Sequence, residues 1–339
     1  MSFQLLDGFD TAAPWSAHAP DAGASGSLQL SAPAVRLGDG WTTATRLQMQ
    51  CAAGATGHYA ERSIPVVDLS STTELRLRLR CGLLADGTTG APFFLRIRLA
   101  SEAVKFADAA NTWERLLPVS QANYWQLVRL SLSDLPAAVR SAVTRVRLEA
   151  TTAAAFIAVF DSLLVGTERV LADVEAALIG ALDKQVASGG ATVPALIYLP
   201  AGPLPAVPNI RICPAMVEYA PDLSVPVEVR GDYTSTGFAM QAGSRGFNLY
   251  YDIDADGAQP GDRAALLDFV LDKMLGTSLL PVNGEYLPVD MVPVPFPTAT
   301  PPVRLPLRLR IRAWKPTAVP VQAVRPVKQI DLHSEGVPQ

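Results

Sequence analysis

Short runs that alternate apolar and polar residues fill the first half of the sequence. They read SLQLS, TRLQMQC, ELRLRLRC, FFLRIRLA, WQLVRLSL, TRVRLEA and FIAVFDSLLVG. Alternation with a period of two places successive side chains on opposite faces of a strand, as a half-buried strand requires. Turn residues separate the runs, and no helical run lies between them. The pattern predicts an all-β jelly-roll sandwich for residues 1–166.

The pattern changes after residue 166. The run TERVLADVEAALIGALDKQ places its apolar residues on one helical face, with Thr167 as the expected N-cap. A second amphipathic helix is expected in DRAALLDFVLDKMLG, and strands in VPALIYLP, VPVEVRGDY, GFNLYYDID and PLRLRIRAW. Two helices packed on a mostly antiparallel sheet predict an α+β domain for residues 167–314.

Proline dominates two stretches of the second half. Residues 287–306 carry seven prolines, so we expect neither a helix nor a central strand there. Residues 315–339 are also spaced by prolines, and we expect an extended C-terminal arm. Such an arm either lies across a neighbouring molecule or stays disordered.

Composition excludes several function classes. No apolar run reaches the roughly 18–20 residues that span a bilayer, and the first residues resemble no signal peptide, so we expect a protein that folds in the cytoplasm. The net charge of −4 does not suggest a nucleic-acid partner. The chain has three cysteines and three histidines without metal-ligand spacing, which predicts buried free thiols and no metal or other cofactor.

Catalytic signatures are missing from the sequence. It has no phosphate-binding loop, no dinucleotide-binding glycine motif and no nucleophile elbow. We therefore expect a protein that is not an enzyme, and a glycan-active enzyme is the least favoured alternative.

Arginines alternate along several predicted strands, so that each set shares one face of its strand. These sets are Arg76, Arg78 and Arg80; Arg96 and Arg98; Arg145 and Arg147; and Arg308, Arg310 and Arg312. One interpretation is a solvated outer face on which the long side chains cover apolar neighbours. The other is a face that meets an acidic partner surface.

The acidic run DIDADG offers negative charges that could pair with one of these arginine sets. Asp252, Asp254 and Asp256 match the start of a calcium loop, but Arg263 occupies the twelfth position, where glutamate is needed. Calcium is therefore the minority interpretation. The favoured one is an acidic subunit contact that faces Arg308, Arg310 and Arg312 of a neighbouring copy, with Asp262 capping the following helix.

Aromatic residues in predicted loops are candidates for gripping sugar rings. Trp41, Tyr59 and Trp113 fit this role best, because aromatic side chains pack against the faces of ligands. The alternative is that all three belong to the core, since aromatic residues dominate burial in sandwiches.

Several segments of the first half resemble a known family. LLDGFD followed by Trp15, then NYWQLVRLSLSDL, VTRVRLEA and FIAVFDSLLVG, resemble the galactose-binding-like jelly rolls found as carbohydrate-binding modules. The resemblance implies a jelly roll in which Trp125 packs inside and Asp161 lies in the final strand. Members bind sugars, bind proteins or serve as spacers.

The second half resembles another group. ERVLADVEAALIGALDKQ, VPALIYLP, NLYYDIDADG with its following helix, and LPLRLRIRA are similar to bacteriophage tail-terminator and tail-completion proteins. The resemblance implies a virion structural subunit, assembled in the host cytoplasm, that forms a homo-oligomeric ring and contacts other tail or neck proteins. The jelly roll would project outward from this ring as a decoration module. Terminator, collar, neck and baseplate positions all remain open. The alternative is a carbohydrate-binding protein that recognises glycans on a host surface.

Overall fold

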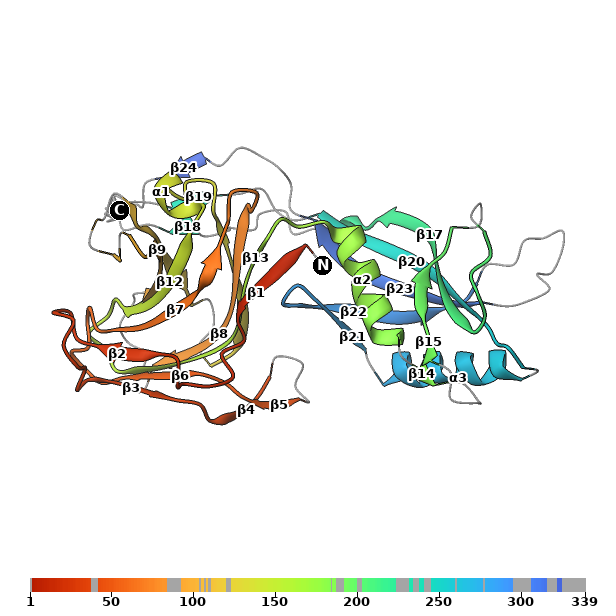
Figure 1. Cartoon of the computed structure of the whole chain (residues 1–339), viewed down its shortest axis with the longest axis horizontal. Coiled ribbons are helices and arrows are strands. Elements are labelled where there is room, and N and C mark those ends of the chain that lie inside the picture. The colour runs from red at the N-terminus through yellow and green to blue at the C-terminus, as the bar shows by residue number, and fades with distance from the viewer. Residues whose placement is uncertain are drawn as a thin grey trace, which may run out of the picture.

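The computed structural model describes residues 2–37, 42–83, 93–103, 105–106, 108, 111–119, 123–183, 185–186, 192–199, 203–223, 232–233, 238–240, 245–259, 261–276, 278–294, 306–315 and 322–324. Figure 1 shows two bodies side by side, a sandwich built from the first half of the chain and a smaller α+β part. The predicted sandwich and the predicted α+β part are both present.

Two antiparallel sheets form the sandwich. Sheet 1 has the order β11 (Trp125–Ser131), β8 (Glu74–Leu83), β13 (Phe156–Gly166), β6 (Gln48–Cys51) and β3 (Leu28–Ser31), and β1 (Phe3–Asp7) also pairs with β13. Sheet 2 begins with β2 (Ser16–His18), β7 (Tyr59–Val67), β12 (Val143–Ala150), β9 (Phe93–Ser101) and β10 (Trp113–Pro118). The hairpin of β4 (Ala34–Arg36) and β5 (Thr43–Thr45) and the short helix α1 (Ala137–Arg140) complete it.

Alternation explains the core of the sandwich. Leu75, Leu77 and Leu79 of β8 are fully buried between the sheets, while the arginines between them point to the other face. Each such leucine contributes about 1.5–3 kcal/mol when removed from water.

Sheet 2 continues beyond the first half of the chain. After β10 its order runs to β18 (Asp232–Tyr233), β19 (Phe238–Met240) and β24 (Gln322–Val324). Figure 1 shows these late segments beside the sandwich. The sheet therefore recruits strands from residues 167–314 and from the predicted arm at 315–339. The predicted domain boundaries and the arm remain predictions.

A third sheet and two helices form the α+β part. Sheet 3 has the order β16 (Ala195–Ile197), β17 (Asn209–Tyr219), β20 (Arg245–Asp256), β23 (Leu307–Lys315), β22 (Glu285–Val292) and β21 (Leu279–Val282). Helices α2 (Val170–Leu182) and α3 (Asp262–Leu275) pack on one face, around a core separate from that of the sandwich. The short strands β14 (Gln185–Val186) and β15 (Thr192–Val193) and the turn Pro221–Leu223 lie between these elements.

Both helices start differently from the sequence prediction. Helix α2 begins at Val170, and Thr167 donates its hydroxyl to the carbonyl of Ser71 at 3.0 Å instead of capping the helix. Asp262 is the first helical residue, not the cap; its carboxylate accepts the N–H of Gln259 at 2.7 Å. A left-handed Gly261 (φ 93°) takes the cap position because glycine adopts that conformation without steric cost.

The helices among the described residues are all too short or too polar to cross a membrane.

The three thiols are free, and two of them lie in the sandwich core. Burial raises the pKa of Cys51 and of Cys81 to about 12, so both thiols stay protonated and unreactive at pH 8. Cys213 is only partly buried, and burial raises its pKa as well. We expect iodoacetamide at pH 8 to modify Cys213 first, and the other two only after unfolding. Mass spectrometry of time points measures this order, and rapid labelling of Cys51 in folded protein would contradict it.

Candidate functional site: the polar face of sheet 2

Two rows of polar side chains cross the outer face of sheet 2. In strand register, one row contains Ser16, Glu61, Arg147, Arg98 and Glu114, and the next contains His18, Tyr59, Glu149 and Arg96. The residues between them, such as Ile97 and Leu148, point into the sandwich core. We call Glu61, Arg147, Arg98, Glu114, His18, Tyr59, Glu149 and Arg96 the polar face.

Ion pairs across the strands join the members of the polar face. Glu149 accepts a hydrogen bond from Arg96, and its other oxygen lies 3.4 Å from Arg98. Glu114 lies 3.1 Å from Arg96 and 3.5 Å from Arg98. Each arginine of β9 therefore bridges two glutamates. Strand pairing brings these charges together, because none of the pairs is close in sequence.

Glu61 of β7 pairs with the arginines of β12. Its two oxygens accept hydrogen bonds from Arg145 at 2.8 Å and from Arg147 at 2.7 Å. Glu102 binds Arg145 at the margin of the face, and the hydrogen bonds from Arg145 and Lys105 lower the pKa of Glu102 to about 2. The predicted arginine pairs on β9 and β12 are therefore neutralised by glutamates of the same chain.

Aromatic rings pack within this network. The rings of His18 and Tyr59 stack with centroids 5.1 Å apart, and the Arg147 guanidinium lies 3.7 Å from the centre of the Tyr59 ring. Arg147 also lies 4.2 Å from the centre of the Phe106 ring. Such cation–π contacts fix the orientation of the guanidinium.

The pKa values of the two arginines of β9 shift in opposite directions. Burial lowers the pKa of Arg98, and its neighbours Arg96 and Arg147 lower it further. For Arg96, burial also acts to lower the pKa, but the hydrogen bond and charge of Glu149 outweigh it, so the pKa of Arg96 is raised. Arg96 and Glu114 are the most accessible charged members of the two rows, with 26% and 34% of their side chains exposed. They are the members best placed to meet a ligand.

The three aromatic residues predicted to bind sugar have different positions. Tyr59 lies in the polar face but is only 6% exposed, so it supports His18 and Arg147 and offers no open ring surface. Trp113 is 2% exposed in the sandwich core, and its indole donates to Asp134 at 3.1 Å. Its ring faces are therefore not accessible to a sugar. Trp41 lies outside the described residues.

Trp125 is a further correction. Instead of packing inside the sandwich, it lies on the outer side of sheet 1 with a small cluster that includes Val35 and Val159. Its indole donates to the carbonyl of Arg36 at 2.8 Å, and Arg80 lies 5.4 Å from the centre of its ring. The β4–β5 hairpin covers this position, which sequence patterns alone did not reveal.

The predicted acidic and basic blocks meet within one chain, on the face of sheet 3 opposite the helices. Arg308 forms a bidentate pair with Asp252 at 2.6 and 2.8 Å. Arg310 and Arg312 both bind Asp290, at 2.8 and 3.0 Å, and the hydrogen bond from Arg310 lowers the pKa of Asp290. These charges are therefore paired within one chain, and their contact with a neighbouring subunit stays a prediction.

The calcium interpretation of the acidic run is corrected as well. Asp252, Asp254 and Asp256 lie in strand β20, so the twelve-residue loop of a calcium site is not formed. Arg211 lies 2.8 Å from Asp254 and 3.0 Å from Asp256. In the part of the chain that the structure describes, no cluster of three or more His, Cys, Asp or Glu residues could hold a metal ion.

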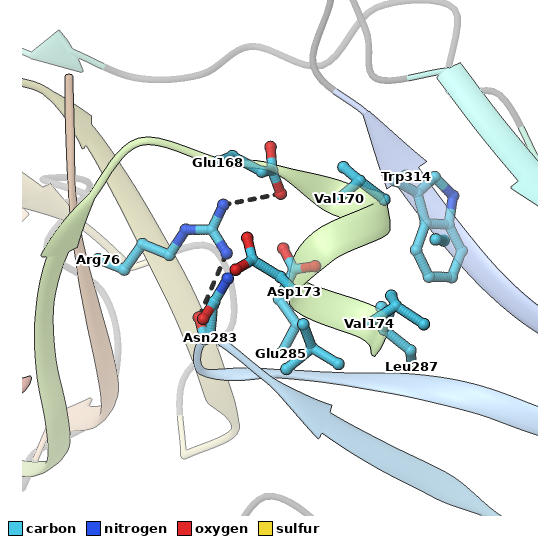
Figure 2. Close-up of a pocket in the computed structure, with 11 residues that line it drawn as sticks. Arg76, Glu168, Val170, Asp173, Val174, Asn283, Glu285, Leu287 and Trp314 are labelled. Carbon is cyan, nitrogen blue, oxygen red and sulfur yellow. Dashed lines mark hydrogen bonds and ion pairs between the residues drawn. The ribbon is translucent and has the colours of Figure 1, made fainter. Parts of the chain in front are cut away.

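Arg76 and Arg78 of β8 lie in the seam between the sandwich and the α+β part. Figure 2 shows the guanidinium of Arg76 directed at Glu168 and Asn283. Arg76 is 1% exposed; it pairs with Glu168 at 2.8 Å and with Glu74 at 3.1 Å, and donates to the carbonyl of Asn283 at 3.2 Å. Arg129 adds an ion pair with Glu285. Arg76 and Arg129 therefore pair with acidic side chains that the same chain supplies.

A tight turn of the α+β part docks onto this seam. Asn283 and Gly284 join β21 to β22 with φ angles of 48° and 82°, as an Asn-Gly hairpin turn requires. Arg78 donates to the carbonyl of Gly284 and lies 4.3 Å from the centre of the Tyr286 ring. A cavity of about 10 Å³ beside Arg76 has room for about one water molecule. The seam is therefore a structural junction and not a ligand pocket.

Comparisons with known proteins give a fold-level likeness only. No protein-family model matches the sequence, and no curated protein matches it. Among solved structures, the family 11 carbohydrate-binding module from Clostridium thermocellum, in complex with a β-1,3-1,4-mixed-linked tetrasaccharide, is 12% identical with a TM-score of 0.35, covering 48% of this chain and 94% of that module. A family 30 carbohydrate-binding module is 13% identical with a TM-score of 0.32, covering 45% and 82%.

A third solved structure is the enzymatically active domain of tailspike protein 4 from bacteriophage CBA120. It is 10% identical with a TM-score of 0.31, and the match covers 46% of this chain and 20% of that domain. At these scores none of the likenesses carries a functional argument. The functional proposal therefore rests on the contacts of the polar face.

Proposed function

We propose that this chain is a non-enzymatic carbohydrate-binding protein whose polar face contacts a neutral glycan. The observation that carries the proposal is the pre-formed network of hydrogen-bonding groups across β7, β12, β9 and β10. Sugar hydroxyls both donate and accept hydrogen bonds, and neighbouring guanidinium and carboxylate groups offer both roles. Groups already fixed by cross-strand pairs lose little entropy on binding.

Charge balance points to an uncharged ligand. The polar face holds three arginines (Arg96, Arg98 and Arg147) and three glutamates (Glu61, Glu114 and Glu149), so neither an anion nor a cation gains a net attraction. A polyhydroxylated chain gains hydrogen bonds to both kinds of group. Hydrogen bonds to charged partners contribute about 1.5–3 kcal/mol each.

A virion structural role, as a ring subunit of a bacteriophage tail or neck, is the second proposal. The exposed edge of strand β17, described below, supports pairing of two copies, and a ring would need a second contact besides this one. Arg308, Arg310 and Arg312 pair with aspartates of their own chain, and a charge contact between subunits stays part of this second proposal. Location in a virion and assembly in a host cytoplasm belong to this second proposal.

Affinity electrophoresis tests the carbohydrate proposal. Gels containing mixed-linked β-glucan, xylan or galactomannan are compared with gels containing acidic polygalacturonate. We expect at least one neutral polysaccharide to retard the protein more than polygalacturonate does. Arg96→Ala should weaken this binding about tenfold, the effect of about 1.4 kcal/mol.

Arg310→Ala is the matched control, because Arg310 is also an arginine that pairs with an acidic residue on the outer face of a sheet. It should keep wild-type retardation. Equal loss in both variants, or no retardation by any neutral polysaccharide, would count against the proposal.

A further inference from the structure

The second half of strand β17 is exposed on both of its faces. Six consecutive residues, from Pro214 to Tyr219, are exposed, although they pair with β20 on one side. Met216 is 48% exposed and Val217 is 56% exposed. A strand in a sheet covered by helices normally hides every second side chain. This segment extends beyond the cover that α2 and α3 give to the rest of sheet 3.

In the part of the chain that the structure describes, the side of β17 away from β20 is an open sheet edge along this segment. Strand β16 pairs only with Ile210 to Ile212, and the last described contact on that side is the N–H of Tyr198 donating to Ile212 at 3.0 Å. Among the described residues, no strand pairs with Met216 or Val217 on this side. Leu199, just beyond β16, is also 62% exposed. Open edges with apolar side chains favour pairing with another chain.

Register shows which backbone groups point outward. Ala220 donates its N–H to the carbonyl of Gly246 at 3.0 Å, so this pair is hydrogen-bonded. Antiparallel pairs alternate between hydrogen-bonded and non-hydrogen-bonded. Val217, opposite Leu249 and three residues earlier, therefore directs its N–H and carbonyl away from β20. A strand placed along this edge would find both groups ready to pair.

We propose that this edge pairs with the same edge of a second copy of the chain, antiparallel and centred on Val217. In that register Val217 exchanges both backbone hydrogen bonds with Val217 of the second copy, and each Met216 lies opposite Glu218. The only charged residue of the exposed segment is Glu218, and this register keeps the two glutamates from facing each other. The contact is a two-fold one that joins two copies of sheet 3.

Pro214 limits how far the paired edge can extend. Pro214 and the register shift between it and Met216 interrupt the edge on one side, because proline has no N–H to donate. The pairing is thus short and centred near Val217. This inference does not depend on glycan binding.

Light scattering after size-exclusion chromatography tests the proposal on the full chain. We expect a dimer at about 100 μM for the wild type and a monomer for Val217→Lys, which sets two ammonium groups opposite each other. Val217→Pro removes only the outward N–H and should also be monomeric, with an unchanged circular dichroism spectrum. Val66→Lys is the matched control, because Val66 is a 70% exposed valine in β7 of the sandwich, and it should stay dimeric.

A disulfide crosslink tests whether the strand that pairs with this edge is β17 of a second copy. In a Cys213→Ser background, Val217→Cys should form an intermolecular disulfide under mild oxidation, since opposite Cα atoms in such a pair are about 5.5 Å apart. A monomeric wild type, or a dimer that persists in Val217→Lys and forms no Val217→Cys crosslink, would overturn the proposal.

Discussion

Replacing Arg76 with alanine is expected to lower the free energy of unfolding by about 3–5 kcal/mol, the cost of breaking a buried ion pair. The guanidinium of Arg76 is almost completely buried and contacts Glu74, Glu168 and the carbonyl of Asn283. Its loss leaves Glu168 in the seam, where the guanidinium of Arg129 lies 3.9 Å from its carboxylate. It also removes the contact of the guanidinium with the ring of Phe3, 4.2 Å away. The seam would therefore lose charge pairing and packing together.

Urea denaturation followed by circular dichroism measures this effect. Arg312→Ala is the control: that side chain is 38% exposed and pairs with the equally exposed Asp290. Exposed ion pairs contribute little, so the control should change stability by less than about 1 kcal/mol. Equal urea midpoints for Arg76→Ala and Arg312→Ala would show that the seam does not stabilise the fold.

Gly284→Ala is expected to destabilise the protein by about 1–3 kcal/mol, because the new methyl group is unfavourable in two ways. Gly284 has a φ of 82°, which L side chains rarely adopt. A Cβ atom there would lie 3.0 Å from Leu164 and 3.4 Å from Leu127, both on the sandwich. The turn would therefore be strained and pushed away from the surface on which it docks.

Gly180→Ala provides a control of opposite sign. Gly180 is an exposed residue inside helix α2, and a Cβ atom there meets nothing within 4 Å. Alanine is favoured over glycine in helices by about 0.5–1 kcal/mol, so this variant should be more stable than the wild type. Thermal unfolding of both variants side by side measures the difference. A Gly284→Ala variant as stable as the wild type would mean that the hairpin is not held against the sandwich.

Local pattern was sufficient to predict the class of each half of the chain. The alternation of Leu75, Leu77 and Leu79 with arginines places β8 in a sheet, and the spacing of Val174 and Leu178 places one face of α2 in a core. Both signals depend on a few neighbouring residues. The strand and helix assignments could therefore be made without knowing which strands are neighbours.

The candidate site depended on information that local pattern does not contain. The arginines of β9 and β12 were visible as alternating sets, but their partners Glu61, Glu114 and Glu149 are separated from them in the sequence. Only strand order and register bring them together. Pairing the acidic and basic residues of predicted neighbouring strands is the signal that could have found this face.

Two tryptophans lie on a different side of their sheet from the one expected, for a related reason. Trp113 was expected in a loop, and it begins strand β10 with its ring in the core. Trp125 was expected inside, and the β4–β5 hairpin lets it pack on the outside of sheet 1. The side of a sheet on which a residue lies reverses with a one-residue change of register.

Hydrogen–deuterium exchange with and without bound polysaccharide tests the central claim most directly, because it locates the glycan on the chain. The neutral polysaccharide that gives the strongest retardation is used as the probe. If the polar face is the binding site, the polysaccharide slows exchange mainly in β7, β9, β10 and β12. Arg96→Ala should abolish this slowing, and Arg310→Ala should leave it unchanged. Slowed exchange confined to sheet 1 or to the α+β part, with sheet 2 unchanged, would contradict the account.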